Sequence, residues 1–278
     1  MNQKKLNNIR INSLISIYLA ESGHPGGVLS SIDIISYLFF SEMNYDKNDF
    51  SKINRDRFIL SKGHCAPALY AVAAEVGIIK KSDLKGLRKL NNKLQGHTHR
   101  LTTPWVEAST GSLGQGFSFA TGEAKGLKIQ GLNNRVFTML GDGELQEGEV
   151  WEAAMFASHH GLNNLCVIID YNKMQSDDFN KNIIGLEPLG DKWKSFNWNV
   201  IEIDGHNQNE IKNAYNSVNN FTNGPFVIIA NTIKGKGVSF MEGFPSWHGS
   251  LKLSYDDLLE AVIELGETEK YIEEFINE

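Results

Sequence analysis

Residues 135–174, RVFTMLGDGELQEGEVWEAAMFASHHGLNNLCVIIDYNKM, decide the fold of this chain. Two apolar runs, 136–140 and 165–169, flank a segment long enough to form a helix. Within one sheet, this strand–helix–strand pattern predicts two parallel strands joined by a right-handed crossover. Both strands then end on the same edge of the sheet, where open α/β folds bind their ligands.

Two polar residues follow these predicted strands directly. Asp142 stands between Gly141 and Gly143 after the first strand, and Asn172 follows the second. Their carboxylate and amide oxygens suit Mg²⁺ or Ca²⁺, and the glycines allow a phosphate to approach backbone N–H groups. A G-D-G triplet alone fits an ordinary turn equally well. The Asn after the second strand favours a metal-bridged diphosphate site instead.

Composition excludes several classes of protein. A net charge of −6 among 278 residues, with a pI near 5.8, argues against a nucleic-acid binder. No apolar run is long enough for a membrane span or a signal peptide. Cys65 and Cys166 lack metal-ligand spacing and indicate no disulfide framework, which favours a reduced, cytoplasmic protein. Without repeats or linkers, we predict one domain over 1–278, with 254–278 an acidic helical tail.

Apolar periodicity and turn residues place the remaining elements. The pattern predicts an amphipathic helix over 4–20, a loop over 22–27 and a solvated basic helix over 80–94. Further helices are predicted at 30–40, from about residue 65 and at 117–127, and further strands at 56–60, 200–203 and 226–230.

The spacing of G-D-G and Asn resembles the thiamine diphosphate motif, and the surrounding GDGELQEGEVWEAA and DYNKMQ resemble transketolases in particular. The resemblance extends along nearly the whole chain, through SGHPGG, SKGH, LQGH, STGSLGQG and WHG. It implies an open, mostly parallel sheet with helices on both faces, of the diphosphate-binding type. It also implies thiamine diphosphate and Mg²⁺ as cofactors, with Ca²⁺ or Mn²⁺ able to substitute for Mg²⁺.

The resemblance implies catalytic roles for four histidines. His24 would point at the reactive carbon of the cofactor, and His64 would contact the diphosphate. His97 would bind hydroxyls of the donor, although the usual proline after it is Thr98 here. His248 would lie between diphosphate and substrate and transfer protons, a task suited to a pKa near neutrality. Each histidine alone would fit a structural role in a loop; the density of motifs favours the catalytic one.

The resemblance also implies the cofactor and metal contacts. Metal ligands would be Asp142, Asn172 and the main-chain carbonyl of Met174. Glu147 would lie at a subunit interface and link two active sites, although a preference for acids at a helix N-terminus would equally explain its position. The implied cofactor-binding residues are His64, Gly111, Ser112, Leu113, Gly141, Asp142, Gly143, Glu147, Asn172 and His248.

In transketolases, a glutamate that contacts the pyrimidine ring lies in a second domain, which we expect to be absent from this chain. The chain therefore resembles the N-terminal subunit of a split transketolase, which moves a two-carbon ketol unit from a ketose or ketose phosphate to an aldose or aldose phosphate. A separately encoded C-terminal subunit would supply the glutamate in an α2β2 heterotetramer. The setting would be cytoplasmic carbohydrate metabolism such as the pentose phosphate pathway. Sulfonated or otherwise modified sugars remain open as substrates.

Three other interpretations stay in view. An α-type subunit of a 2-oxoacid dehydrogenase also carries G-D-G and Asn, but SGHPGG, SKGH and LQGH count against it. A 1-deoxyxylulose phosphate synthase-like fragment fits LQEGEVWEAA and DKW less well. A non-enzymatic relative that only binds cofactor or partner would be expected to lack metal or histidine positions, and all are present.

Overall fold

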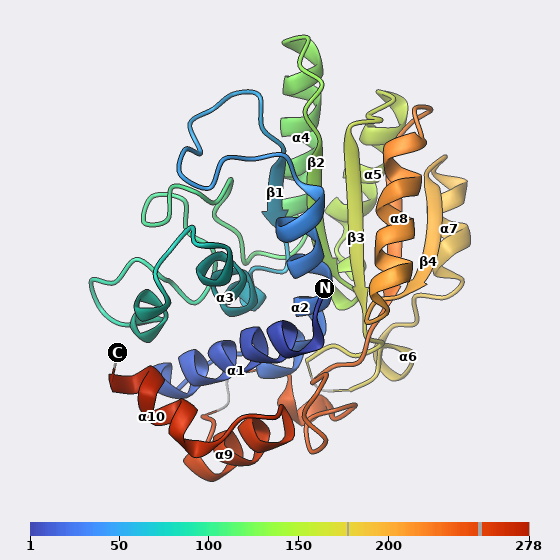
Figure 1. The fold of residues 1–278 in the computed structure, drawn as a ribbon. Helices are drawn as coiled ribbons and strands as arrows, with labels where there is room; N and C mark the ends of the chain where they lie inside the picture. Colours follow the sequence, from blue (N-terminus) through green and yellow to red (C-terminus); the bar gives the residue numbers. More distant parts are fainter. Residues whose placement is uncertain (177, 250–251, 278) are drawn as a thin grey trace.

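The computed structural model describes residues 1–176, 178–249 and 252–277 (Figure 1). Its centre is a five-stranded sheet in the order β1-β2-β3-β5-β4, and every neighbouring pair is parallel. The predicted open, parallel α/β sheet is therefore confirmed. The strands are β1 (Arg57–Leu60), β2 (Val136–Gly141), β3 (Leu165–Tyr171), β4 (Asn199–Asp204) and β5 (Phe226–Asn231).

Helices cover both faces of the sheet (Figure 1). One face packs against α2 (Pro25–Tyr37), α3 (Ala66–Val76) and α8 (Gln208–Asn220), with α1 (Gln3–Ala20) packed on α2 and α3. The other face packs against α4 (Gln115–Ile129), α5 (Gly148–His159) and α7 (Leu189–Ser195). The remaining helices are α6 (Asn180–Ile183), α9 (Tyr255–Glu264) and α10 (Glu269–Asn277).

The central strand β3 shows why its sequence is continuously apolar. Cys166 and Ile168 belong to the core on the α2 side, whereas Val167 and Ile169 belong to the core on the α5 side. Successive side chains of a strand point to opposite faces, so a strand covered by helices on both sides needs apolar residues at every position.

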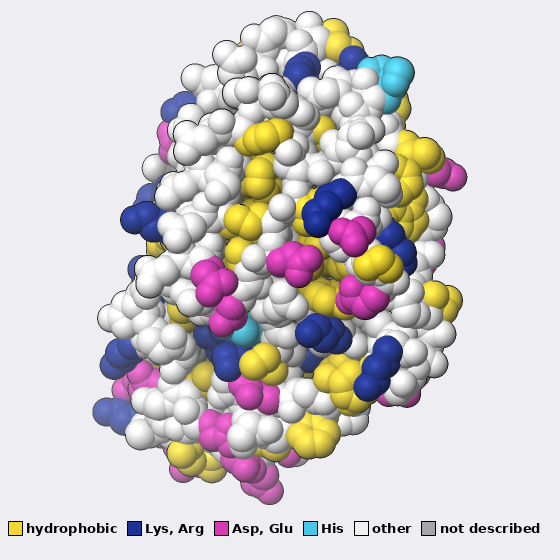
Figure 2. Space-filling view, turned by 90° about the vertical axis from the view of Figure 1, so that its right-hand side faces the viewer, with side chains coloured by type: hydrophobic (Ala, Val, Ile, Leu, Met, Phe, Trp, Pro, Cys, Tyr) yellow, Lys and Arg dark blue, Asp and Glu magenta, His cyan; other side chains and the backbone are white. Residues whose placement is uncertain are grey.

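The face of the molecule over α7 and α8 carries charges of both signs (Figure 2). Figure 2 shows the face over α7 and α8, where acidic and basic side chains alternate with apolar ones. No helix in the described part of the chain is long and apolar enough to cross a membrane.

The loop predicted over 22–27 is shorter than expected. Of the residues 22–27, only 22–24 lie outside a helix, because α2 begins at Pro25. His24 occupies the N-cap position of this helix. Proline is well accommodated there, since the first helical residue needs no N–H for the helix ladder. This places His24 directly at the start of α2. Helix α1 occupies the predicted 4–20 segment but is not amphipathic, because residues 9–17 are all buried.

The predicted solvated helix over 80–94 is wrong. The structure has a 3-10 helix over Lys81–Gly86, followed by irregular chain. Arg88 and Asn91 have positive φ angles of 58° and 60°, a left-handed backbone that an α-helix cannot contain. Leucines at 84, 87 and 94 are buried, so this segment packs on the core.

The predicted acidic tail contains α9 and α10, which pack against the rest of the chain through Leu258, Val262, Ile272 and Phe275. Its final residue, Glu278, lies outside the described residues. Figure 1 shows both helices beneath α1, close to the side on which the strands end.

Candidate active site

A cleft of about 360 Å³ lies where the strands end. Residues that directly follow β1, β2, β3 and β5 line it, together with residues from the loops before α2 and α4. Of the predicted site residues, Ser112 and Gly141 lie outside the lining: Ser112 is exposed, and Gly141 is the last residue of β2. The predicted residues that line the cleft are His24, His64, His97, Gly111, Leu113, Asp142, Gly143, Glu147, Asn172, Met174 and His248.

The four predicted histidines form one cluster around His24. The centroid of its ring is 5.1 Å from that of His64, 5.7 Å from that of His248 and 6.4 Å from that of His97. Two glycines allow this packing. A Cβ atom at Gly249 would lie 2.0 Å from the His24 ring, and one at Gly111 would lie 2.7 Å from the His97 ring.

The environment keeps all four imidazoles neutral at pH 7. Burial, aided by the positive charge of Arg88, lowers the pKa of His24 to about 4. Burial and the nearby Lys234 lower the pKa of His248 to about 3. The pKa values of His64 and His97 are also lowered, mainly by burial. The expectation of pKa values near neutrality is thus not met, because the ring cluster is desolvated and faces cations.

Asp142 and Asn172 bring oxygen donors to the cleft from the ends of β2 and β3. The Asp142 carboxylate is 2% exposed and accepts hydrogen bonds from the backbone N–H groups of Gly143, at 2.9 Å, and Lys173. Burial and the negative charge of Asp170 raise the pKa of Asp142 to about 7. The Asn172 Oδ1 accepts from the N–H of Met174 at 3.1 Å. The raised pKa means that burial and Asp170 disfavour the charged form of the Asp142 carboxylate. A bound cation would offset this cost, so the site fits a cation as the partner of Asp142.

The donor set limits what kind of metal site this can be. Among the described residues, no group of three or more His, Cys, Asp or Glu side chains could hold a metal ion. A cation beside Asp142 would therefore depend on amide and main-chain oxygens as further ligands. That set matches the hard, oxygen-seeking ions Mg²⁺ and Ca²⁺ and not zinc.

The sequence patterns did not predict a buried ion pair that lies beneath the cleft. Lys62, just after β1, pairs with Asp170 in β3, and the side chains are 2% and 0% exposed. Asp170 also accepts hydrogen bonds from Thr232, just after β5, and from Ser30 in α2 at 2.7 Å. Although burial acts to lower it, the Asp170 charge holds the pKa of Lys62 above its ordinary value. This network joins three strand ends and a helix.

Glu144 does more than place a negative charge at the N-terminus of a helix, because its carboxylate connects several loops. Its buried carboxylate accepts from Ser61 Oγ, from the N–H of Gly114 at 2.9 Å and from the N–H of Gly141 at 3.0 Å. It therefore ties together the loops that follow β1 and β2 and the loop that precedes α4. Glu147, by contrast, is exposed at the N-cap of α5, on the rim of the cleft.

Lys234 is a further cleft residue whose role the sequence did not reveal. It follows β5, is 1% exposed, and lies 2.7 Å from His248 Nδ1 and 3.2 Å from the main-chain oxygen of Gln175. Burial lowers its pKa to about 8, so the amine is mostly protonated at pH 7 and donates to His248. His248 then carries its own proton on Nε2.

Comparison with known proteins identifies the family of the chain. The family model described as "Transketolase, thiamine diphosphate binding domain" matches residues 1–273. The 6-deoxy-6-sulfo-D-fructose transketolase subunit SqwG of Clostridium sp. (strain MSTE9) is 43% identical over 263 residues, which is 95% of each chain. An apulose-4-phosphate transketolase subunit from Phocaeicola vulgatus is 35% identical over 90% of this chain and 89% of its own.

Solved structures show the same fold in longer proteins. The transketolase of Campylobacter jejuni aligns with a TM-score of 0.91 and 31% identity. The alignment covers 96% of this chain but only 44% of that one, so this chain corresponds to less than half of a full-length transketolase.

The fold is thus that of a thiamine diphosphate-binding α/β protein. The chain belongs to the family of the transketolase thiamine diphosphate-binding domain. This confirms the sequence-based prediction of a transketolase relative and of its cofactor class, and it disfavours the 2-oxoacid dehydrogenase and 1-deoxyxylulose phosphate synthase interpretations.

Proposed function

We propose that this chain is the diphosphate-binding subunit of a two-chain transketolase. It would transfer a two-carbon ketol unit from a ketose or ketose phosphate to an aldose or aldose phosphate. The observation that carries the proposal is the convergence of four neutral histidines with the Asp142 and Asn172 oxygens in one cleft of a chain of this family.

The residues of the cleft fit the cofactors. Asp142, Asn172 and the main-chain oxygen of Met174 would hold Mg²⁺, for which Ca²⁺ or Mn²⁺ could substitute. When bound, thiamine diphosphate supplies the carbon nucleophile and the electron sink for ketol transfer. Other cofactor contacts would come from His64, Gly111, Ser112, Leu113, Gly141, Gly143, Glu147 and His248.

The histidines would handle the protons of the substrate. A neutral imidazole can accept a proton from a hydroxyl group, and His24 and His97 lie close enough together to serve neighbouring hydroxyls. His248, with its proton on Nε2 and its Nδ1 bonded to Lys234, is set to donate. His64 lies 5.6 Å from His248, measured between ring centroids, and would contact the diphosphate side of the same space.

A second polypeptide would complete the enzyme. Relatives of nearly the same length are named as subunits, which supports a separately encoded C-terminal chain. That chain would supply the pyrimidine-contacting glutamate in an α2β2 assembly, and Glu147, on the rim of the cleft, would lie where the active sites meet. We expect the complex to work in the cytoplasm.

The test is reconstitution. The tagged chain would be purified from its host and the co-purifying partner identified, and then ketol transfer would be measured for each chain alone and for the pair. Donors should include pentose and hexose phosphates and a sulfonated ketose, since one relative is named for 6-deoxy-6-sulfo-D-fructose and another for apulose 4-phosphate.

We expect turnover only with both chains, thiamine diphosphate and Mg²⁺ present. Full ketol transfer by this chain without a second polypeptide would refute the two-chain proposal. A reconstituted pair that binds the cofactor but transfers no ketol unit from any of these donors would refute the assigned reaction.

A further inference from the structure

A buried polar network lies behind the cleft, where α1, α2 and the loop after β4 meet. Arg10 in α1 and Asp33 in α2 are each 2% exposed and form an ion pair. His206, in the loop after β4, places its Nδ1 atom 2.8 Å from the same Asp33 oxygen that Arg10 contacts. Two side chains from different elements therefore share one carboxylate oxygen.

The hydrogen bonds of His206 fix its tautomer. Its Nε2 atom accepts from the backbone N–H of Ile233 at 2.9 Å. A backbone N–H can only donate, so Nε2 is unprotonated and the ring proton resides on Nδ1, from which it is donated to Asp33. The ring thus connects the Asp33 carboxylate to the first part of the loop that follows β5.

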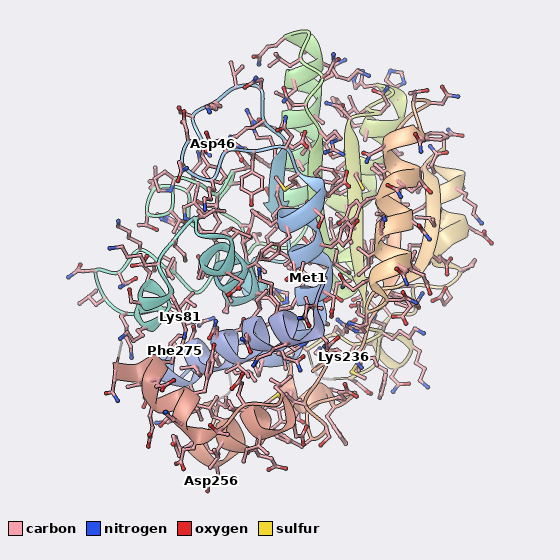
Figure 3. All side chains as sticks on the ribbon, viewed as in Figure 1. Met1, Asp46, Lys81, Lys236, Asp256 and Phe275 are labelled. Carbon is pink, nitrogen blue, oxygen red and sulfur yellow. The ribbon has the colours of Figure 1, made fainter. Side chains whose placement is uncertain are left out.

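Arg10 makes the second connection to this loop. Its Nε donates to the main-chain oxygen of Lys236 at 3.1 Å. Figure 3 shows Lys236 beside α1, just beyond the ends of the strands. Between the two anchored positions, the N–H of Gly235 donates to the main-chain oxygen of Gly26, in the first turn of α2, at 3.0 Å.

Lys234 is the residue that these anchors enclose. Its backbone lies between Ile233 and Gly235, both of which are held by hydrogen bonds, and its side chain extends into the cleft to His248 and the oxygen of Gln175. A shift of the loop would move the ammonium group away from His248, and with it the hydrogen bond that sets the tautomer of that histidine.

We propose that Arg10, Asp33 and His206 form a clamp that positions Lys234 in the cleft, with His206 as its decisive positioning residue. None of the three is among the residues that line the cleft. The clamp itself is independent of the enzymatic assignment; its consequence for catalysis rests on the proposed function.

Two substitutions separate the two hydrogen bonds of His206. The amide nitrogen of an asparagine sits near the position of Nδ1, so His206→Asn keeps the bond to Asp33 and loses the bond to Ile233. The amide oxygen of a glutamine sits near the position of Nε2, so His206→Gln keeps the bond to Ile233 and loses the bond to Asp33. His159→Asn, at an exposed histidine on α5, is the matched control.

The measurement is hydrogen–deuterium exchange on the full chain, followed over peptides that contain residues 231–237. In His206→Asn we expect amide exchange in this loop to be about tenfold faster, the effect of one lost hydrogen bond on local opening. The increase should be smaller in His206→Gln and absent in His159→Asn. The rate at which an acylating reagent modifies the otherwise buried Lys234 amine should rise most in His206→Asn, less in His206→Gln and not at all in His159→Asn.

A direct test needs no variant. In the ¹⁵N spectrum of the native chain, His206 should show the signature of the Nδ1–H tautomer at neutral pH. An Nε2–H tautomer would overturn the proposal, as would unchanged loop exchange in His206→Asn. In the reconstituted enzyme, His206→Asn should lower kcat severalfold at unchanged sugar KM. An inactive native pair would count against the proposed function alone, because exchange and tautomer report on the clamp without turnover.

Discussion

Asp142 is the residue on which cation binding should depend. Replacing it with Asn keeps the shape of the side chain but leaves a metal ion with neutral oxygens only. We expect Asp142→Asn to weaken Mg²⁺-dependent binding of thiamine diphosphate by at least about a hundredfold, because removing a charged ligand should cost at least as much as the roughly 10–100-fold lost with a residue that only supports a ligand. Calorimetric titration of the reconstituted complex would measure this.

The same variant should remain folded, because a buried carboxylate whose pKa is raised to about 7 is costly in its charged form. Thermal unfolding of the chain alone is the control. Unchanged cofactor affinity in Asp142→Asn would remove the metal-ligand assignment.

Lys62 and Asp170 allow a second test at the scale of single residues. Asp170→Asn would leave the Lys62 ammonium buried without its counter-ion, which should lower the free energy of unfolding by about 3–5 kcal/mol. Adding Lys62→Met should recover part of that loss, since the unpaired charge is then gone. Urea unfolding would compare these variants with Lys194→Met, whose partner Asp191 is solvent-exposed and whose effect should stay below about 1 kcal/mol.

At the scale of elements, the start of α4 is fixed by a glycine. A Cβ atom on Gly116 would lie 2.6 Å from the Cα of Ser61, a backbone atom in the chain after β1 that cannot move aside. Gly122 lies in the same helix with nothing within 4 Å of the corresponding position. The first turn of the helix can therefore lie this close to the chain after β1 only because residue 116 has no side chain, whereas Gly122 faces away from the sheet.

We expect Gly116→Ala to lower the free energy of unfolding by about 1–3 kcal/mol through overpacking. Gly122→Ala should raise it by about 0.5–1 kcal/mol, because alanine favours the helix. Denaturant unfolding of the isolated chain would measure both. Equal effects of the two substitutions would contradict the close approach at Gly116.

Sequence patterns predicted the strands better than the segments between them. A fully apolar run such as 165–169 has only one good place, between two layers of helices, and it is found there. The segment 80–94 has helix-favouring residues, but three of its leucines, at 84, 87 and 94, pack on the core through a backbone that turns left-handed at Arg88 and Asn91. Tertiary packing decided that conformation, and local propensity contains no signal of it.

At the scale of the whole molecule, the depressed histidine pKa values make stability depend on pH. The pKa values of His24 and His248 are lowered from 6.5 to about 4 and about 3. Between the ordinary and the lowered values, the unfolded chain binds more protons than the folded one, so the free energy of unfolding falls as the pH falls from about 6.5 to about 4. Asp142 acts in the opposite sense, because its pKa is raised.

A comparison of variants isolates the histidine contribution. Urea unfolding across this pH range should show a steeper loss of stability in the native chain than in His24→Gln/His248→Gln, which lacks the two groups. Parallel profiles would mean that the two rings are not desolvated to this degree.

Only part of the candidate site could be predicted from the sequence, because the strand order of the whole molecule decides which residues become neighbours. The histidines and Asp142 stand in recognisable phrases, and the structure brings them together. Lys62 and Asp170 stand in the same phrases, but nothing in linear spacing shows that neighbouring strand ends bring them together as an ion pair, or that the loop after β5 places Lys234 against His248. Their roles follow from the strand order, which sets which ends are neighbours.

The cluster of histidines joins positions 24 and 248, with contributions from most of the chain between them. During synthesis, the cleft cannot exist until the chain up to residue 248 has left the ribosome, because β5 must insert between β3 and β4 and the loop carrying Lys234 must bond to the start of α2. A cofactor therefore cannot guide the early steps of folding. Its binding instead reports that the segments from His24 to His248 have folded together.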